Sequence, residues 1–305
     1  MILVALLTGL ATAAGVFAEG RLGARAEGWS ERLLELLLWV LVPVVTFVNM
    51  VHLHLNEQVG AGVAFGGLAV ALTLLVAWRV GRGLLHLPDP SVGALMVAAA
   101  FGNTGFLGLP FVTALFGGGE LANAIVYDLV LTSVGVVTVG FSVGAAFGNR
   151  APAGATERAR AILLRNPPLW AAAAGAIAPA ALSPEWAVRA THELVYVLPV
   201  IGFFVVGVTL SAEAEEDRLG FPPPFTRPVA AALVMKLVLL PGVVLALSAL
   251  LIDIPRPYPV QAAMASAINT LLIAHKFGLD RALIASVVAW STALVVAAGL
   301  AVSLL

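Results

Sequence analysis

FGNTGFLGLP, residues 101–110, lies in the middle of a long apolar segment and combines three helix-weakening glycines with a proline. Pro110 has no N–H, and its ring clashes with the carbonyl four residues earlier, at Phe106. The stretch predicts a helix that breaks near Asn103, with Pro110 in the first turn of a second half-helix. Close helix packing is the other use of such glycines in membranes, but it requires neither the asparagine nor the proline.

The chain around this stretch is far more apolar than a water-soluble domain. Of its 305 residues, 61% are hydrophobic and 11% are charged, and the mean hydropathy is +1.02. Only helices or closed barrels satisfy the backbone in lipid, and the alternating pattern of a barrel is absent, so we predict an all-α membrane protein. Apolar runs of about 20 residues predict ten spans, near 1–18, 33–53, 59–78, 91–117, 120–147, 167–182, 191–211, 228–252, 257–275 and 281–304.

Positive charge is distributed unequally between alternate loops. Thirteen Lys and Arg residues fall on one side and two on the other, with Lys236 left inside a span. Because short cytoplasmic loops retain basic residues, both termini are expected on the outer side of the cell membrane. The first apolar segment ends in small residues but has no basic start, so we expect a retained helix and not a signal peptide.

The ten spans divide into two groups of five. The longest connection, 148–166, separates a first five-helix repeat at 1–147 from a second at 167–305. Five is odd, so the two repeats would be inserted in opposite orientations. A second Asn-Thr pair, Asn269-Thr270, then falls in the ninth span, at a place equivalent to that of Asn103-Thr104 in the fourth.

Paired interruptions at mid-bilayer depth are the usual pointer to a transporter binding site. If the two breaks cross, the half-helix N-termini favour an anion, and the opposing carbonyls favour a cation such as Na⁺. The predicted solute-binding residues are Asn103, Thr104, Gly105, Pro110, Asn269 and Thr270.

Three stretches resemble the auxin efflux carrier family, whose bacterial members include proposed malonate and malate carriers. Asn103 to Val112 resembles the family's fourth-helix motif, Arg165-Asn166-Pro167-Pro168-Leu169 the start of its sixth helix, and Gln261-Ala262-Ala263-Met264 with Asn269 its ninth. The family commonly has a proline soon after that methionine, whereas Ala265 and Ser266 follow here. The ninth-helix break would therefore rest on Ser266, Asn269 and Thr270.

The resemblance implies a fold like that of the bile acid/sodium symporters, with two inverted five-helix repeats. Helices 1, 2, 6 and 7 would form a scaffold, and helices 3–5 and 8–10 a moving core in which helices 4 and 9 cross. Plant members are homodimers that export anionic auxin by an elevator-like movement. A homodimer is therefore the expected assembly.

Two charged residues lie well inside predicted spans, Asp128 in the fifth and Lys236 in the eighth. An ionised side chain there costs at least about 2.5–3.5 kcal/mol on insertion scales. Asp128 would be a proton- or cation-coupling group, with Lys236 as its partner or as an attraction for a substrate carboxylate. Alternatively, the two form a static ion pair that fixes the core helices.

The sequence thus predicts a secondary transporter of a small organic anion, with the lipid bilayer as its environment and Na⁺ or H⁺ as candidate coupling ions. There is no P-loop and no HExxH or GxSxG motif, so neither ATP-driven transport nor enzymatic activity is expected. We expect no cofactor, no metal site and no nucleic-acid partner. A membrane-embedded ligand sensor and an ion channel are the alternatives.

Overall fold

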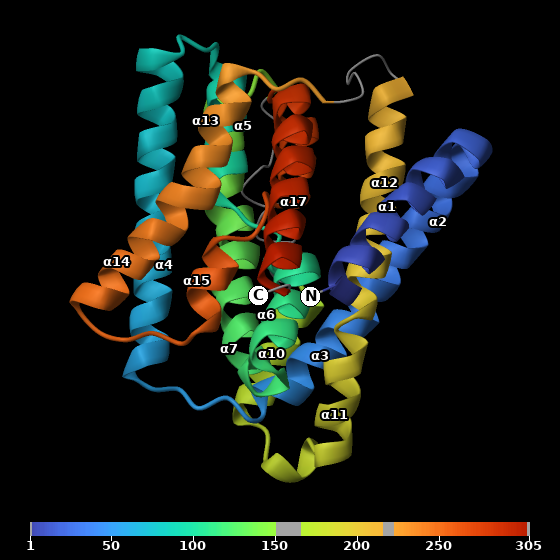
Figure 1. Cartoon of the computed structure of the whole chain (residues 1–305), viewed down its shortest axis with the longest axis vertical. Helices are drawn as coiled ribbons and strands as arrows, with labels where there is room; N and C mark the ends of the chain where they lie inside the picture. The colour runs from blue at the N-terminus through green and yellow to red at the C-terminus, as the bar shows by residue number, and fades with distance from the viewer. Residues whose placement is uncertain (1, 151–165, 216–222, 304–305) are drawn as a thin grey trace.

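The computed structural model describes residues 2–150, 166–215 and 223–303, and these residues form helices and no strand beyond one isolated bridge. Figure 1 shows the helices running roughly along the long axis of the molecule, with both termini near mid-height. Most of the predicted connection 148–166 lies outside the described residues, as do Arg158, Arg160, Arg165 and Arg218.

The first half of the chain contains α1 Ile2–Leu22, α2 Ala24–Leu36, α3 Val42–Met50, α4 Glu57–Arg79, α5 Asp89–Ala100, α6 Leu109–Phe116, α7 Leu121–Tyr127 and α8 Phe141–Phe147. The second contains α10 Pro167–Ile177, α11 Glu185–Leu194, α12 Val197–Glu215, α13 Arg227–Val234, α14 Leu240–Leu250, α15 Pro257–Ala262, α16 Asn269–Phe277 and α17 Arg281–Ser303. π-Helical segments occupy Leu37–Leu41, Val80–Leu84, Thr104–Gly108, Asp128–Ser133, Val136–Gly140 and Met235–Leu239.

Local sequence sets several of these helix ends. Asn56 and Asn166 cap α4 and α10 with their side-chain oxygens, as expected for asparagine before a first turn. Proline occupies the first turn of α5 and α10, where a missing N–H costs nothing. Gly278 ends α16 in the left-handed conformation at φ 71°, which glycine adopts without strain.

Seven continuous helical segments within the described residues are long and apolar enough to cross a membrane. Three of the ten predicted spans are not among them. The spans predicted at 91–117 and 257–275 are each interrupted, as α5 and α6 and as α15 and α16. The span predicted at 167–182 contains only α10, whose 11 residues end at Ile177.

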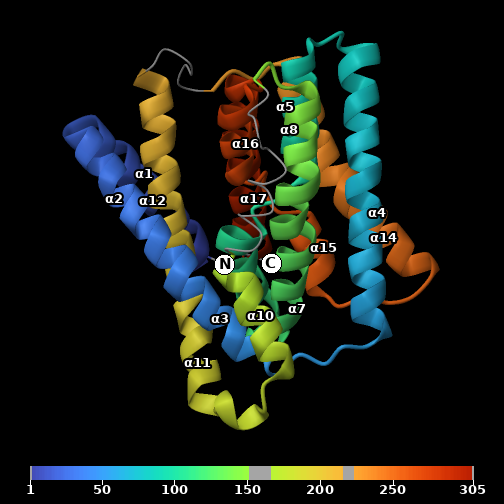
Figure 2. The ribbon, with the colours of Figure 1, turned by 180° about the vertical axis from the view of Figure 1, so that it is seen from behind.

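The helices pack in two groups, one formed by α1–α3 and α10–α12 and the other by the remaining helices. In both views α1, α2 and α12 lie together at one side of the molecule and α4 and α14 at the other (Figures 1 and 2). Figure 2 shows α3, α10 and α11 at the lower end, below α1 and α12, and α10 packs on α3. In the other group α5 is buried on every side from Val92 to Ala100, against α4, α8, α13 and α17.

The crossing of α1 and α12 brings two backbones into direct contact. A Cβ atom added at Gly15 would lie 2.2 Å from the carbonyl oxygen of Phe204, and one added at Gly207 would lie 2.2 Å from that of Thr12. Small residues permit this approach between membrane helices, where van der Waals contact drives association. The pair α1–α12 is therefore held by close main-chain packing.

Candidate solute-binding site

The first interruption lies between α5 and α6. After Ala100 the chain becomes extended at Phe101, with φ −104° and ψ 133°. It resumes a helical path at Thr104, and the π-helical segment Thr104–Gly108 continues directly into α6. The second half-helix thus begins at Thr104, six residues before Pro110. Pro110 lies in the first turn of α6, which starts at Leu109, but it is not in the first turn of the half-helix as predicted.

The second interruption lies between α15 and α16, and the two interruptions satisfy each other's backbone groups. The N–H of Asn103 donates to the carbonyl of Ala265 at 2.6 Å, and the N–H of Ala267 donates to the carbonyl of Phe101 at 3.0 Å. Gly102 and Ser266 thereby form an isolated antiparallel bridge. Non-helical main chain inside a membrane is tolerated only where such partners exist.

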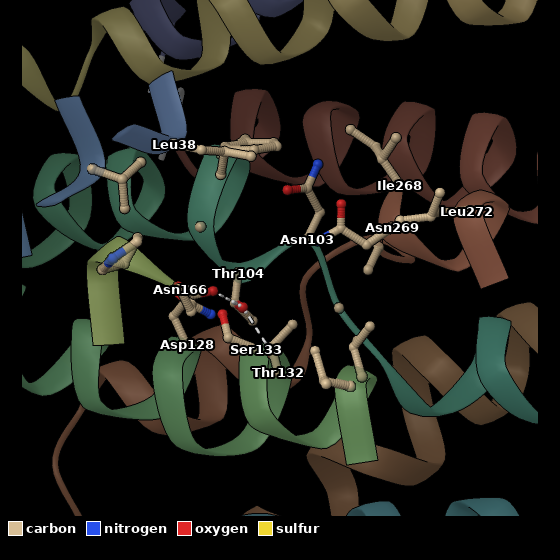
Figure 3. Close-up of a pocket in the computed structure, with 18 of the residues that line it drawn as sticks. Leu38, Asn103, Thr104, Asp128, Thr132, Ser133, Asn166, Ile268, Asn269 and Leu272 are labelled. Atoms are coloured by element: carbon tan, nitrogen blue, oxygen red, sulfur yellow. Dashed lines mark hydrogen bonds between the residues drawn. The ribbon is translucent and has the colours of Figure 1, made fainter. Parts of the chain in front are cut away.

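We call the two paired interruptions, residues 101–103 and 265–267, the crossover. A pocket of about 270 Å³ lies against the crossover, between the two helix groups. One wall comes from the crossover and the segment that carries Asp128, and the other from the π-helical segment before α3 and from the start of α10. Figure 3 shows Asn103, Thr104, Asp128 and Asn269 around the pocket, with Leu38 on the other wall. Its lining is Leu38, Trp39, Val42, Gly102–Phe106, Asp128, Thr132, Ser133, Val136, Val137, Phe141, Asn166–Pro168, Ala267–Asn269 and Leu272.

Asn103 supplies an unsatisfied hydrogen-bond donor to this lining. The residue is 5% exposed, and its side-chain Nδ2 has no hydrogen-bond partner among the described residues. A buried amide without a partner costs free energy of about 1–3 kcal/mol. Such a group in a pocket is a candidate contact for a bound molecule.

Asp128 is the one ionisable side chain in the described lining of the pocket. It is 9% exposed, and its Oδ1 accepts a hydrogen bond of 2.5 Å from the hydroxyl of Thr104. The hydroxyl oxygens of Thr104 and Thr132 are 2.8 Å apart. The carboxyl group is therefore tied to the first residue of the broken helix.

Lys236 does not pair with Asp128, although both residues lie in the described part of the chain. The Lys236 side chain is 1% exposed, and its Nζ donates to the carbonyl of Ala262, the last residue of α15, at 3.0 Å. The predicted static ion pair is therefore not formed. Lys236 instead supplies positive charge to a helix C-terminus, where cations are stabilised.

The structure brings together five of the predicted site residues and places three elsewhere. Asn103, Thr104, Gly105, Asp128 and Asn269 line the pocket, whereas Pro110, Thr270 and Lys236 do not. The Thr270 hydroxyl donates to Ala267 within the first turn of α16. Trp39, Thr132, Ser133 and Asn166 also line the pocket and were not predicted as site residues. Of these only Asn166 carried a signal, an asparagine directly before two prolines at a helix start.

Comparison with known proteins agrees with a membrane transporter class. Residues 21–151 match the model of a family described as "Membrane transport protein". An uncharacterized transporter of Methanothermobacter thermautotrophicus is 36% identical over 109 residues, which cover 34% of this chain and 32% of that protein. An uncharacterized transporter of Methanocaldococcus jannaschii is 40% identical over 55 residues, 18% of each chain.

The predicted resemblance is thus confirmed over the matched segment, which contains the first interruption and Asp128. The chain aligns with about a third or less of the length of these curated relatives. Together with the seven apolar helical segments among the described residues, the match indicates a multi-pass membrane protein.

Proposed function

We propose that this protein is a secondary transporter of a small organic anion of the carboxylate class. The observation that carries the proposal is the buried Asn103 amide, which has no partner among the described residues and lies in the pocket beside two cross-paired helix breaks. Broken helices of this kind in secondary transporters point half-helix N-termini at anionic substrate groups.

The pocket favours an anion through dipoles and amides, since no Lys, Arg or His belongs to its described lining. The first main-chain hydrogen bond of the half-helix runs from the Gly108 N–H to the Asn103 carbonyl at 3.0 Å. The main-chain N–H groups of Thr104 to Leu107 come before Gly108 in the half-helix. The first N–H groups of a helix have no acceptor within that helix. Together with the Asn103 Nδ2 they form a positively polarised helix end.

Asp128 provides the coupling in this proposal. An ionised carboxylate in the same low-dielectric pocket repels an anionic solute, so binding requires that the charge of Asp128 be neutralised. A proton or Na⁺ taken up with the solute does this and links the two fluxes. The alternative role of Asp128, in a fixed ion pair with Lys236, loses support because Lys236 donates to Ala262.

Alternating access would be elevator-like, with the group that carries the crossover sliding past the group formed by α1–α3 and α10–α12. The position of the pocket between the two groups supports this movement. The proposal includes ten spans in two inverted repeats, a homodimeric scaffold and both termini outside. The family resemblance and the distribution of arginines support these features.

Uptake of radiolabelled carboxylates into proteoliposomes tests the proposal, with wild type compared against Asn103→Ala. Removal of this amide should abolish saturable uptake while the protein still folds, because the main-chain bonds of Asn103 do not involve its side chain. Asn123→Ala is the matched control, since Asn123 bonds to Glu120 and does not line the pocket. Near-normal uptake by Asn103→Ala would refute the site, and unsaturable conductance in a bilayer would indicate a channel.

A further inference from the structure

The pocket lining contains another asparagine, Asn166, whose side-chain Nδ2 has no part in the cap of α10. It directly precedes α10 in an extended conformation, with φ −99° and ψ 95°. Its side-chain Oδ1 accepts the N–H of Leu169 at 3.3 Å. Its carbonyl oxygen accepts the N–H groups of Leu169 at 3.1 Å and Trp170 at 3.3 Å. Pro167 and Pro168 have no N–H, and the N–H groups of Leu169 and Trp170 already donate to Asn166. The first main-chain N–H groups of α10 are therefore not available to a solute.

The cap also fixes which way the planar amide of Asn166 is turned. Because Oδ1 accepts from the Leu169 N–H, the cap does not use the two Nδ2 hydrogens. No described residue accepts a hydrogen bond from this Nδ2, and Asn166 lines the pocket. Figure 3 labels Asn166 among the side chains that line the pocket.

We infer that Asn166 is a solute-contacting residue, whose side-chain amide donates a hydrogen bond to the bound anion together with the amide of Asn103. The inference rests on the proposed function and adds a second donor to it. Asn103 belongs to the crossover and is buried with its Nδ2 unsatisfied among the described residues. Asn166 caps α10, which packs on α3. A carboxylate has two acceptor oxygens, which matches two amide donors that come from separate walls.

This arrangement makes the solute a bridge between the two helix groups. Asn166 would then affect the affinity for the solute, and its capping bond would serve only to hold the amide in the productive orientation. A purely structural asparagine would instead need only its Oδ1, which Asp or Ser can replace at a helix N-terminus with little loss.

Asn166→Asp separates these two roles. Aspartate retains an oxygen that can accept from Leu169, but it replaces the Nδ2 donor with a negatively charged acceptor. Asn166→Ser retains a capping oxygen on a shorter side chain. The matched control is Asn56→Asp, since Asn56 caps α4 through the same type of bond, to Val59 at 2.9 Å, and does not line the pocket.

The readouts are the KM for radiolabelled malonate, malate and phenylacetate in proteoliposomes, and the thermal midpoint of each purified variant. We expect all three variants to keep the wild-type midpoint. We also expect Asn166→Asp to raise KM by about tenfold or more, the order expected for a lost hydrogen bond to a charged group. Asn166→Ser should raise KM less, and Asn56→Asp should leave it unchanged.

A wild-type KM in Asn166→Asp would overturn the inference and leave the proposed function intact. So would a lowered midpoint in Asn166→Asp together with normal KM in Asn166→Ser, because that combination marks a capping role alone. If the wild-type protein moves none of the carboxylates, the proposed function fails first and the inference fails with it.

Discussion

Thr104 and Asp128 are joined by a hydrogen bond of 2.5 Å between the first residue of the broken helix and a carboxyl group carried by the neighbouring π-helical segment. The bond links the element expected to bind solute to the side chain expected to bind the coupling ion. Any change in the charge of Asp128 therefore alters the hydrogen bonding of the residue that starts the half-helix.

Replacing Thr104 with valine should weaken transport. Valine keeps the shape of threonine but cannot donate to Asp128, and a hydrogen bond to a charged group contributes roughly 1.5–3 kcal/mol. We expect the initial rate of uptake to fall by about tenfold or more, since about 1.4 kcal/mol corresponds to one decade. Thr113→Val is the control, because that hydroxyl donates only to Leu109 in its own helix. Equal rates in the two variants would contradict the role given to Thr104.

Asp128→Asn should uncouple the proposed transporter. Asparagine can still accept from the Thr104 hydroxyl, but it carries no charge to be neutralised by H⁺ or Na⁺. We expect accumulation driven by an imposed ion gradient to disappear while exchange of labelled for unlabelled solute continues. Both are measured in the same proteoliposomes. Gradient-driven accumulation at the wild-type level would show that coupling resides elsewhere.

Gly108→Ala should destabilise the crossover. A Cβ atom there would lie 1.9 Å from Oε1 of Gln261, whose Nε2 donates to the carbonyl of Ala124. Overpacking of this kind typically costs roughly 1–3 kcal/mol, and a lower thermal midpoint in detergent is the expected result. Gln261→Ala should partly restore Gly108→Ala, because the clash disappears. Strictly additive effects in the double variant would argue against direct contact.

Gly15→Ala should destabilise the α1–α12 pair, because the added methyl group meets the main-chain oxygen of Phe204 at 2.2 Å. A main-chain atom cannot rotate away as a side chain can, so the helices must separate. Gly9→Ala on the same helix is the control, since nothing lies within 4 Å of its Cβ position. The thermal midpoints of the two variants should differ, and equal midpoints would show that the crossing is looser than described.

Local sequence signals predicted much of the helical pattern. Glycines and a proline within 101–110 indicated an interruption in the apolar segment, and Asn269 marks the first residue of α16. The position of the restart at Thr104 was not predicted. It depends on the bond from Asn103 to Ala265, a residue far away in the chain, and on a π-helical turn that moves Pro110 away from the break.

The partners of the buried charges were harder to predict. The sequence placed Asp128 and Lys236 inside predicted spans and left a coupling role and a static ion pair open, because it does not show which face of each helix a side chain leaves from. Packing gave Asp128 a hydroxyl partner, Thr104, and gave Lys236 the carbonyl at the end of α15. The wall formed by Trp39 and Asn166 depends likewise on long-range packing.

The mutual pairing of the two interruptions also bears on how the protein is made. During synthesis the segment around Phe101 emerges well before Ala265 and Ala267, which supply its hydrogen-bond partners. Until then its main-chain groups must be satisfied by water, by the insertion machinery or by a temporary continuous helix. Assembly of the first half in the bilayer is therefore complete only after the second half has been translated.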